Sequence, residues 1–322
     1  NVVIYHLIQR LKDMDICGEI ILVPNCNPIG TNIKAGEYTL GRFDPVNGTN
    51  WNRGYFFDKD AVEHFAKTVT REESIEGIKQ RFRAHLSNAI DNKLAEPWGL
   101  GLAQQLNLKL QQMAVNADFV LDLHNGPVST RHVYIPEYAK DSAKLFNIPH
   151  CIFIPNVFAG ALDEATFCPW WTLQESIKTN LAREVSFNVE AFTLEMGSQE
   201  VIDFNEGNID ATSILSYLNA KGVLHECDIK PTEMKRLGVY LKDYKTLFTN
   251  WGGMVEYMAK PGQTVKKGEP LAQILNIDDL DTDNGSRTLE APCDLIPILH
   301  FPSASVLSGT QLYKVFTNYR EL

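Results

Sequence analysis

The sequence lacks an excess of positive charge and lacks a long hydrophobic segment. Its 322 residues include 40 acidic and 30 basic side chains, which gives a formal net charge of -10 and a pI of about 5.3. Without a basic stripe, the chain is not expected to bind nucleic acid. No apolar run approaches the roughly 20 residues that span a bilayer, and no signal peptide is visible. We therefore expect neither nucleic acid nor membrane as a partner.

Cysteine motifs are absent as well. The six cysteines are scattered, and none forms a C-x-x-C pair: Cys17, Cys26, Cys151, Cys168, Cys227 and Cys293. This spacing argues against a thiolate zinc site and against a disulfide framework in a chain of this size. A reducing compartment is the simplest environment for such a sequence, so we expect a cytoplasmic protein.

Several common catalytic signatures are also missing. The glycines show neither the G-x-G-x-x-G nor the P-loop spacing, so a nucleotide site has little support. The G-x-S-x-G motif of serine hydrolases does not occur. Seven of the eight histidines lie in no metal motif and are interpreted as structural or surface residues: His6, His64, His85, His132, His150, His225 and His300.

Hydrophobic periodicity predicts alternating helices and strands up to about residue 226. Helical spacing occurs at 2–13, 70–92, 100–116, 172–184 and 209–221, and strand-like apolar runs occur at 19–23, 118–124, 131–135, 151–154 and 190–197. This alternation predicts an α/β fold with a mixed, mostly parallel sheet flanked by helices. The helices within 57–95 form an insertion to which the sequence assigns no role.

The pattern of predicted secondary structure changes after about residue 226. Residues 235–318 carry short alternating strands and turn residues without a convincing long helix. The segments 252–274 and 289–312 both place a valine, a glycine-containing turn and an apolar residue in that order, which indicates an imperfect internal repeat. We expect an α/β domain at 1–228 and a small all-β domain at 229–322.

The segment 118–126 is the best candidate for a functional strand end. Phe119, Val120 and Leu121 form a short apolar run, and His124 follows at the carboxyl end, before Gly126. Ligand sites of open α/β sheets gather at the carboxyl ends of strands. His124 can present a ring nitrogen to a metal, with Asp122 orienting the ring. The alternative is a hydrogen-bonded histidine without a metal.

A second strand, at 190–197, ends in the same way. Glu195 lies at its carboxyl end, before Gly197. If the two strands are parallel, Glu195 and His124 point toward the same edge of the sheet. A carboxylate beside a metal-bound water is a good general base. The alternative interpretation of Glu195 is a helix-capping or surface residue.

A long loop at 24–54 carries candidate anion-binding residues. It contains Arg42 and the pair Asn52-Arg53, and ordered domains rarely keep loops of this length without a use. The planar guanidinium of arginine binds a carboxylate through two hydrogen bonds. Arg131 is a weaker candidate of the same kind. The alternative for each arginine is a solvated surface residue.

Taken in order, four short motifs resemble the succinylglutamate desuccinylase/aspartoacylase family, which has a zinc carboxypeptidase-like fold. They are Asn27-Pro28-x-Gly30, Asn52-Arg53 before Gly54-Tyr55-Phe56, Leu121-Asp-Leu-His124-Asn-Gly126, and Thr193-Leu-Glu195-Met-Gly197. The resemblance covers most of the chain, and the terminal β domain looks like the barrel-sandwich appendage of this family. No lysine lies in the Met-Lys context of a biotin or lipoyl carrier.

The resemblance implies a hydrolase with one zinc per chain that cleaves the amide bond of a small N-acyl amino acid. His124 would be a zinc ligand and Glu195 would activate the zinc-bound water. Asn52 and Arg53 would hold a substrate carboxylate, with Arg131 as a further substrate-binding candidate, and Arg42 would bind substrate or polarise the scissile carbonyl. A homo-oligomer is compatible with this pattern.

One part of the family pattern is not found. The family's other two zinc ligands come from a His-x-x-Glu motif after the first strand, and this sequence contains no such motif. We expect the two further ligands upstream of Asn1; the alternative is a chain that naturally lacks them, which could not hold zinc in the usual way because a single histidine is too few ligands. Two alternatives remain open: a zinc carboxypeptidase acting on short or cell-wall peptides, and a non-catalytic module that binds carboxylates.

Overall fold

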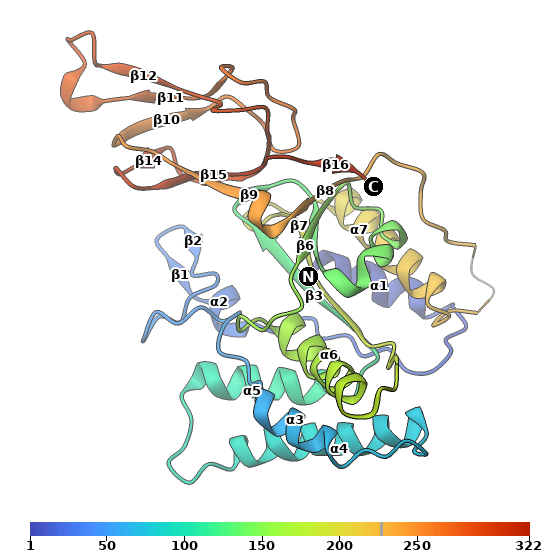
Figure 1. The fold of residues 1–322 in the computed structure, drawn as a ribbon. Helices are drawn as coiled ribbons and strands as arrows, with labels where there is room; N and C mark the ends of the chain where they lie inside the picture. Colours follow the sequence, from blue (N-terminus) through green and yellow to red (C-terminus); the bar gives the residue numbers. More distant parts are fainter. Residues whose placement is uncertain (226–227) are drawn as a thin grey trace.

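A six-stranded mixed sheet forms the centre of the fold (Figure 1). The structure, a computed structural model, describes residues 1–225 and 228–322. Three neighbouring strand pairs are parallel and two are antiparallel, which confirms the predicted mixed α/β fold. The strands follow in the order β16 (Arg320–Glu321), β8 (Leu237–Tyr240), β6 (His150–Ile154), β5 (His132–Pro136), β7 (Glu190–Ser198) and β3 (Phe119–Gly126).

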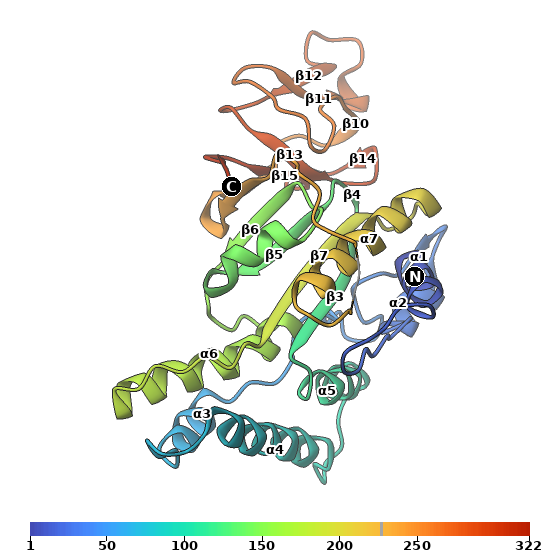
Figure 2. The same ribbon diagram turned by 90° about the vertical axis from the view of Figure 1, so that its right-hand side faces the viewer.

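Helices cover both faces of this sheet (Figure 2). On one face, α1 (Val2–Leu11) and α7 (Phe204–Ala220) pack against each other and on side chains of β5, β6 and β7. On the other face, α6 (Leu162–Leu181) packs on β3 and β7. Because successive side chains of a strand point to opposite faces, β7 buries Phe192 and Leu194 under α1 and α7 and turns Thr193 and Glu195 toward α6.

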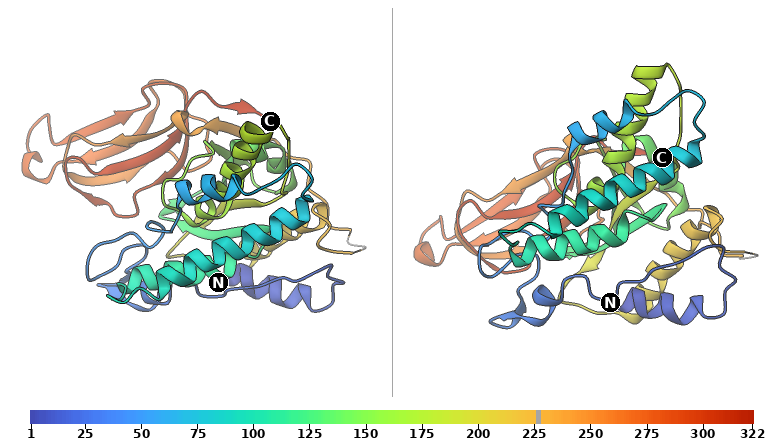
Figure 3. Two further views of the ribbon diagram at one scale, coloured as in Figure 1. Left: turned by 60° about the horizontal axis from the view of Figure 1, so that its bottom comes forward. Right: turned by 90° about the horizontal axis from the view of Figure 1, so that it is seen from below.

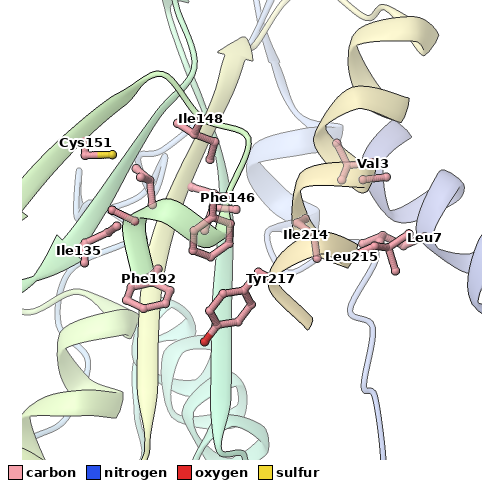
Figure 4. Packing of buried hydrophobic residues seen from close by; sticks show 14 of the residues in the cluster. Val3, Leu7, Ile135, Phe146, Ile148, Cys151, Phe192, Ile214, Leu215 and Tyr217 are labelled. Atoms are coloured by element: carbon pink, nitrogen blue, oxygen red, sulfur yellow. The ribbon is translucent and has the colours of Figure 1, made fainter. Parts of the chain in front are cut away.

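The core under α1 and α7 is built from aromatic and branched side chains (Figure 4). Phe146 and Tyr217 stack with their ring centroids 4.5 Å apart and their planes 9° from parallel. Val3 and Leu7 of α1 pack on the same cluster and are almost fully buried. Burial of side chains of this size stabilises the fold by about 1.5–3 kcal/mol each, so this cluster holds the sheet face opposite the site in place.

The helical insertion extends the core beyond α6. It forms α3 (Lys59–Ala66) and α4 (Ile75–Leu94), and α4 lies beside α5 (Leu102–Ala114), as the view from below shows (Figure 3). The insertion contacts α6 through buried apolar side chains, among them Val62, Phe65, Ile78, Phe82, Trp170 and Leu173.

Four element predictions were wrong in position or type, and one of them is the helix predicted at 209–221, which begins at Phe204. The helix predicted from residue 70 begins at Ile75, because Ser74 Oγ accepts the N–H of Gly77 at 3.0 Å and caps it there. Helix α6 begins at Leu162, ten residues early, and contains Pro169; buried neighbours offset the hydrogen bond that proline removes. Residues 19–23 form no ladder with any described residue; Ile20 and Leu22 pack on the core instead, whereas Ile21 is exposed.

The remaining strands form two four-stranded sheets and one small hairpin. Residues 244–316, here called the β region, contain β9 (Tyr244–Phe248), β10 (Gly253–Tyr257), β11 (Pro270–Leu275), β12 (Ser286–Glu290), β13 (Ile296–His300), β14 (Ser305–Val306) and β15 (Gln311–Phe316). Its two sheets enclose an apolar core of their own. The predicted barrel-sandwich form of this region stays a prediction.

Short elements complete the chain. The long loop contains helix α2 (Pro28–Asn32) and the hairpin of β1 (Lys34–Ala35) and β2 (Tyr38–Thr39). Three 3-10 helices lie at Glu137–Leu145, Leu241–Asp243 and Ile277–Asp279. None of the helices in the described part of the chain combines the length and the apolar character needed to cross a membrane.

The α/β part and the β region share strands. β4 (Val128–Ser129), just after β3, pairs with β13, whereas β8 and β16 belong to the six-stranded sheet. Strands from both sides of residue 228 therefore contribute to both parts, and the division into 1–228 and 229–322 stays a prediction. Glu226 and Cys227, next to that boundary, lie outside the described residues.

Candidate active site

His124 and Glu195 are direct neighbours in the sheet. β3 and β7 are parallel, and the register pairs the Cα atoms of these two residues. Directly paired residues point to the same face of a sheet. The two side chains therefore share one face and one edge, as the sequence predicts for parallel strands.

Asp122 orients the ring of His124. Its Oδ2 lies 2.8 Å from Nε2 of the histidine, and both residues are on β3. Burial lowers the pKa of His124, but Asp122 and then Glu195 and Asp163 outweigh it and raise the pKa to about 9. When the neutral ring donates Nε2–H to Asp122, Nδ1 keeps the lone pair. A carboxylate behind a histidine is the usual arrangement for a metal ligand.

Glu195 carries a buried oxygen without a partner. Among the described residues, none forms a hydrogen bond with its Oε2. Gly126 lies next to this carboxylate, and a Cβ at that position would approach Ser129 Cβ to 3.1 Å. Buried polar atoms are almost always hydrogen-bonded, so an unpaired carboxylate oxygen indicates a functional position.

His132 and His150 extend the row across the sheet. The antiparallel pairing of β5 with β7 places His132 beside Glu195, and His150 of β6 is the next residue in the row. His132 donates Nδ1–H to the carbonyl of Thr130 at 2.9 Å, which leaves Nε2 buried and unpartnered among the described residues. Burial lowers the pKa of His132, so the ring is neutral. No feature of the sequence indicates that His132 adjoins Glu195, because the direction in which neighbouring strands run cannot be read from it.

A second buried carboxylate lies behind His124. Asp163, in the first turn of α6, is almost completely buried. Burial and then the charges of Asp122 and Glu164 raise its pKa to about 7. The sequence reading did not single out Asp163, whose helix starts earlier than predicted. The negative environment of Asp122 and Asp163 favours a cation at the neighbouring histidine.

Asn52 and Arg53 lie on a loop fixed against the site. Asn52 Oδ1 accepts the N–H of Leu162 at 3.3 Å, and its Nδ2 lies 3.5 Å from His124 Nε2. Asn107 donates to the carbonyl of Arg53 at 2.7 Å. These contacts bring the loop, the start of α6 and His124 together. Asn52 therefore adjoins the predicted metal ligand, with part of its amide used to hold α6.

The Asn27-Pro28-x-Gly30 motif supports the loop that precedes Arg42. Asn27 Nδ2 donates to the carbonyl of Gly41 at 3.0 Å, while its Oδ1 accepts the N–H of Gly30 at 3.0 Å. A Cβ at Gly30 would lie 2.1 Å from the Gly41 oxygen, so only glycine fits this approach. Trp51 N–H then donates to the Arg42 carbonyl at 2.7 Å, which connects Arg42 to the Asn52-Arg53 loop.

Arg131 is not brought together with these residues. Its Nε donates to Asp210 Oδ1 at 2.5 Å, and its other nitrogen binds the carboxylate of Glu206; both acids are on α7. These ion pairs give Arg131 a structural explanation. Its predicted contact with substrate stays a prediction.

Aromatic residues and one lysine complete the surroundings of Glu195. The ring of Tyr244, on β9, lies 6.3 Å from the rings of both His132 and Tyr134. Lys314, on β15, places its Nζ 5.2 Å from the centroid of the Tyr244 ring. These residues were not predicted from the sequence. The one signal that could have pointed to Lys314 is its position as a charged residue within the otherwise largely apolar strand segment 311–316.

A zinc ion would find part of its ligand set here. The orienting bond from Asp122 and the unpaired oxygen of Glu195 fit a metal ligand and a base beside it. Within residues 1–225 and 228–322, however, no group of three or more His, Cys, Asp or Glu side chains could hold a metal ion. The described residues alone therefore do not complete a zinc site.

Comparison with known proteins identifies the family. The family model described as the succinylglutamate desuccinylase/aspartoacylase catalytic domain matches residues 1–220. The chain belongs to this family. The desuccinylase and aspartoacylase activities in its name release an acyl group from an amino acid, which agrees with the predicted base and the predicted metal ligand at adjacent strand ends.

Solved structures of the family extend the likeness over the β region. A Shewanella frigidimarina protein named for succinylglutamate desuccinylase/aspartoacylase is 44% identical, with a TM-score of 0.96 over 100% of this chain and 86% of its own. A family protein from Shewanella amazonensis is also 44% identical, with a TM-score of 0.96 over 100% and 87%. No curated protein matches the chain.

A more distant structure shares the fold alone. The product-bound ectoine utilization protein of Ruegeria pomeroyi is 16% identical, with a TM-score of 0.62 over 98% of this chain and 80% of its own. The fold thus persists at low identity, and it does not by itself fix the substrate.

Proposed function

We propose that the protein is a zinc-dependent hydrolase that cleaves the amide bond of a small N-acyl amino acid. One observation carries the proposal: an oriented histidine and a buried glutamate with an unpaired oxygen are direct neighbours on strands β3 and β7. In this family, that pair matches a metal ligand and a general base.

His124 is the zinc ligand that this chain supplies. When bound, zinc acts as a Lewis acid and lowers the pKa of its water to about 7. Catalytic zinc takes three protein ligands, so the proposal needs two more. The His-x-x-Glu motif that supplies them in the family is not found in this sequence.

Glu195 is the general base and then the general acid. Its free Oε2 is available to take a proton from the attacking water, and the same carboxyl then gives that proton to the leaving amine. Because both transfers happen at one buried oxygen, the proton is kept away from solvent between them. The neutral ring of His132 next to it adds no competing charge.

The loop arginines hold the substrate. Arg53 and Asn52 bind a carboxylate, and Arg42 binds the substrate or polarises the scissile carbonyl. Neither arginine forms an ion pair with a carboxylate of the described residues. An arginine that stabilises the developing oxyanion lowers the barrier more than one that binds only the ground state.

A panel of substrates tests the proposal on the full-length protein. N-acetyl and N-succinyl amino acids are compared with short peptides that have a free carboxyl terminus, and release of the amine is measured. We expect turnover of one or more N-acyl amino acids that exceeds turnover of every peptide. Faster turnover of peptides would replace the proposal by a carboxypeptidase, and binding of the acyl amino acids without turnover would replace it by a binding module.

A further inference from the structure

Helix α5 binds the backbone of the segment that begins at Arg53. Asn107 Nδ2 donates to the Arg53 carbonyl at 2.7 Å. Gln111 uses both ends of its amide on one residue: its Oε1 accepts the N–H of Phe56 at 2.9 Å, and its Nε2 donates to the Phe56 carbonyl at 2.6 Å. Residues four positions apart lie on one face of a helix. This face of α5 therefore binds residues 53–56 as a paired strand would.

The start of α6 holds the same segment from another side. Tyr55 N–H donates to the Gly160 carbonyl at 3.3 Å, and Leu162 N–H donates to Asn52 Oδ1. A Cβ at Gly160 would lie only 3.4 Å from Cδ of Arg53, so the two chains are in close contact. Nη1 of Arg53 donates to the carbonyl of Asn52 at 2.5 Å. The direction of the guanidinium therefore depends on how this backbone is held.

The helical insertion supports α5 and the end of this segment. Helix α4 of the insertion lies beside α5 (Figure 3), and Gln112 of α5 donates to Asp91 Oδ1 of α4 at 2.5 Å. The ring of Phe56 packs in an apolar cluster with Leu86 and Ile90 of α4. The insertion thus contacts the segment directly through one aromatic ring and indirectly through α5.

Packing alone does not account for the two amides of α5. Asn107 is 2% exposed and Gln111 is 6% exposed, and Oδ1 of Asn107 is buried without a partner among the described residues. Burial of an amide is unfavourable unless its groups are paired. Leucine and methionine have similar volumes and would avoid this cost. The amides are therefore explained by what they bind, which is the backbone of residues 53–56.

We propose that Asn107 and Gln111 are positioning residues that hold Arg53 in the orientation that binds the substrate carboxylate, and that the helical insertion serves as their support. The inference rests on the function proposed above, in which Arg53 binds this carboxylate. Both amides act through the backbone of residues 53–56. A segment that takes its binding conformation for only part of the time lowers the apparent affinity by that fraction. The two amides therefore set KM and not the rate of the chemical step.

Gln111→Met and Asn107→Leu test the role of the amides in the full-length protein. The substrates are the N-acyl amino acid of the panel that is turned over fastest and its α-carboxamide. We expect each variant to raise KM for the acid about 10- to 100-fold, with kcat and the kcat/KM for the carboxamide within about threefold of the wild type. Gln112→Met is the matched control, because Gln112 is an exposed glutamine of α5 that binds Asp91. It should change neither substrate.

A double variant shows whether Gln111 acts through Arg53. If it does, Gln111→Met raises KM by less than about twofold in an Arg53→Met background. A full additional rise, or an equal loss with the acid and the carboxamide, would assign the amides a general structural role and overturn the inference. An active enzyme with unchanged KM in both α5 variants would overturn the inference alone and leave the proposed hydrolase standing.

Two further measurements decide the inference even if no compound of the panel is turned over, a result that would count against the proposed function. Hydrogen–deuterium exchange at Phe56 N–H should be at least about tenfold faster in Gln111→Met and unchanged in Gln112→Met. In calorimetric titrations with N-acetylalanine, both α5 variants should bind at least about tenfold more weakly than the wild type. Unchanged exchange, equal affinities, or no binding by the wild type would overturn the role of Asn107 and Gln111.

Discussion

Strand β7 carries a glutamate near each end, and the two have opposite surroundings. At the start of the strand, Glu190 accepts hydrogen bonds from Ser142 Oγ at 3.0 Å, Tyr217 OH at 2.8 Å and Lys221 Nζ at 2.7 Å. At the other end, Glu195 has a buried Oε2 without a partner among the described residues. The same residue type on one strand is thus fully paired at one end and unpaired at the other.

The different surroundings of Glu190 and Glu195 indicate different roles, a structural one for Glu190 and a functional one for Glu195. Burial of a carboxylate is unfavourable unless hydrogen bonds and charges replace its hydration. The donors around Glu190 do this and join the 3-10 helix at Glu137–Leu145, α7 and β7 into one network. Glu195 has no such compensation, and the rest of the fold carries the cost. Groups kept in this state are concentrated at active sites.

The largest expected effect comes from removing the charge of the unpaired glutamate. Glu195→Gln preserves the shape of the side chain but cannot take a proton from water. We expect kcat/KM to fall about 10²- to 10⁴-fold, with the zinc content and the melting temperature close to those of the wild type. Steady-state kinetics, elemental analysis and thermal unfolding check this. A variant with normal activity would assign the base to another residue.

The second effect is a pH dependence of stability caused by His150, which pairs with His132 in the sheet. Burial lowers the pKa of His150 to about 4, although a hydrogen bond to the Arg131 carbonyl opposes this. In the unfolded chain a histidine has a pKa of about 6.5. Its contribution to stability is thus fully present above about pH 6.5 and is lost as the pH falls toward 4, by about 3 kcal/mol in total.

Denaturant unfolding at pH 7.5 and pH 4.5 measures this loss. His150→Leu should reduce the difference in free energy of unfolding between the two pH values, because leucine takes up no proton. His64→Leu, at an exposed position of α3, is the control and should leave the difference unchanged. An identical pH dependence in wild type and His150→Leu would contradict the assignment.

The smallest effect is expected at the paired glutamate. Glu190→Gln keeps the side chain but weakens the interaction with Lys221, so the free energy of unfolding should fall by about 1–3 kcal/mol. The activity of the folded enzyme should change less than about threefold, since Glu190 lies at the opposite end of β7. Reversal of the two phenotypes, with Glu190→Gln inactive and Glu195→Gln unstable, would break the comparison.

The strands of the site could be predicted because their sequences are locally clear. An apolar run followed by a polar residue and glycine identifies the ends of β3 and β7, and parallel pairing then brings His124 and Glu195 together. The extended segment 19–23 has the same local character but forms no ladder with the described residues. Strand propensity thus indicates where a strand can form, and partners decide whether it does.

Residues contributed across the fold could not be predicted. His132 lies beside Glu195 through antiparallel pairing that the sequence does not encode locally. Arg131 illustrates the same limit, because the sequence does not show that this arginine is paired with acids of α7. Charged residues can be counted from a sequence, but their partners appear only in the folded chain.

Zinc content is the most direct test of the central claim, that His124 and Glu195 form a zinc hydrolase site. Elemental analysis is carried out on the full-length protein as wild type and as His124→Ala. We predict about one zinc per chain in the wild type and a strongly reduced content in His124→Ala, with both proteins folded. A wild type without zinc, or equal zinc in both proteins, would contradict the account.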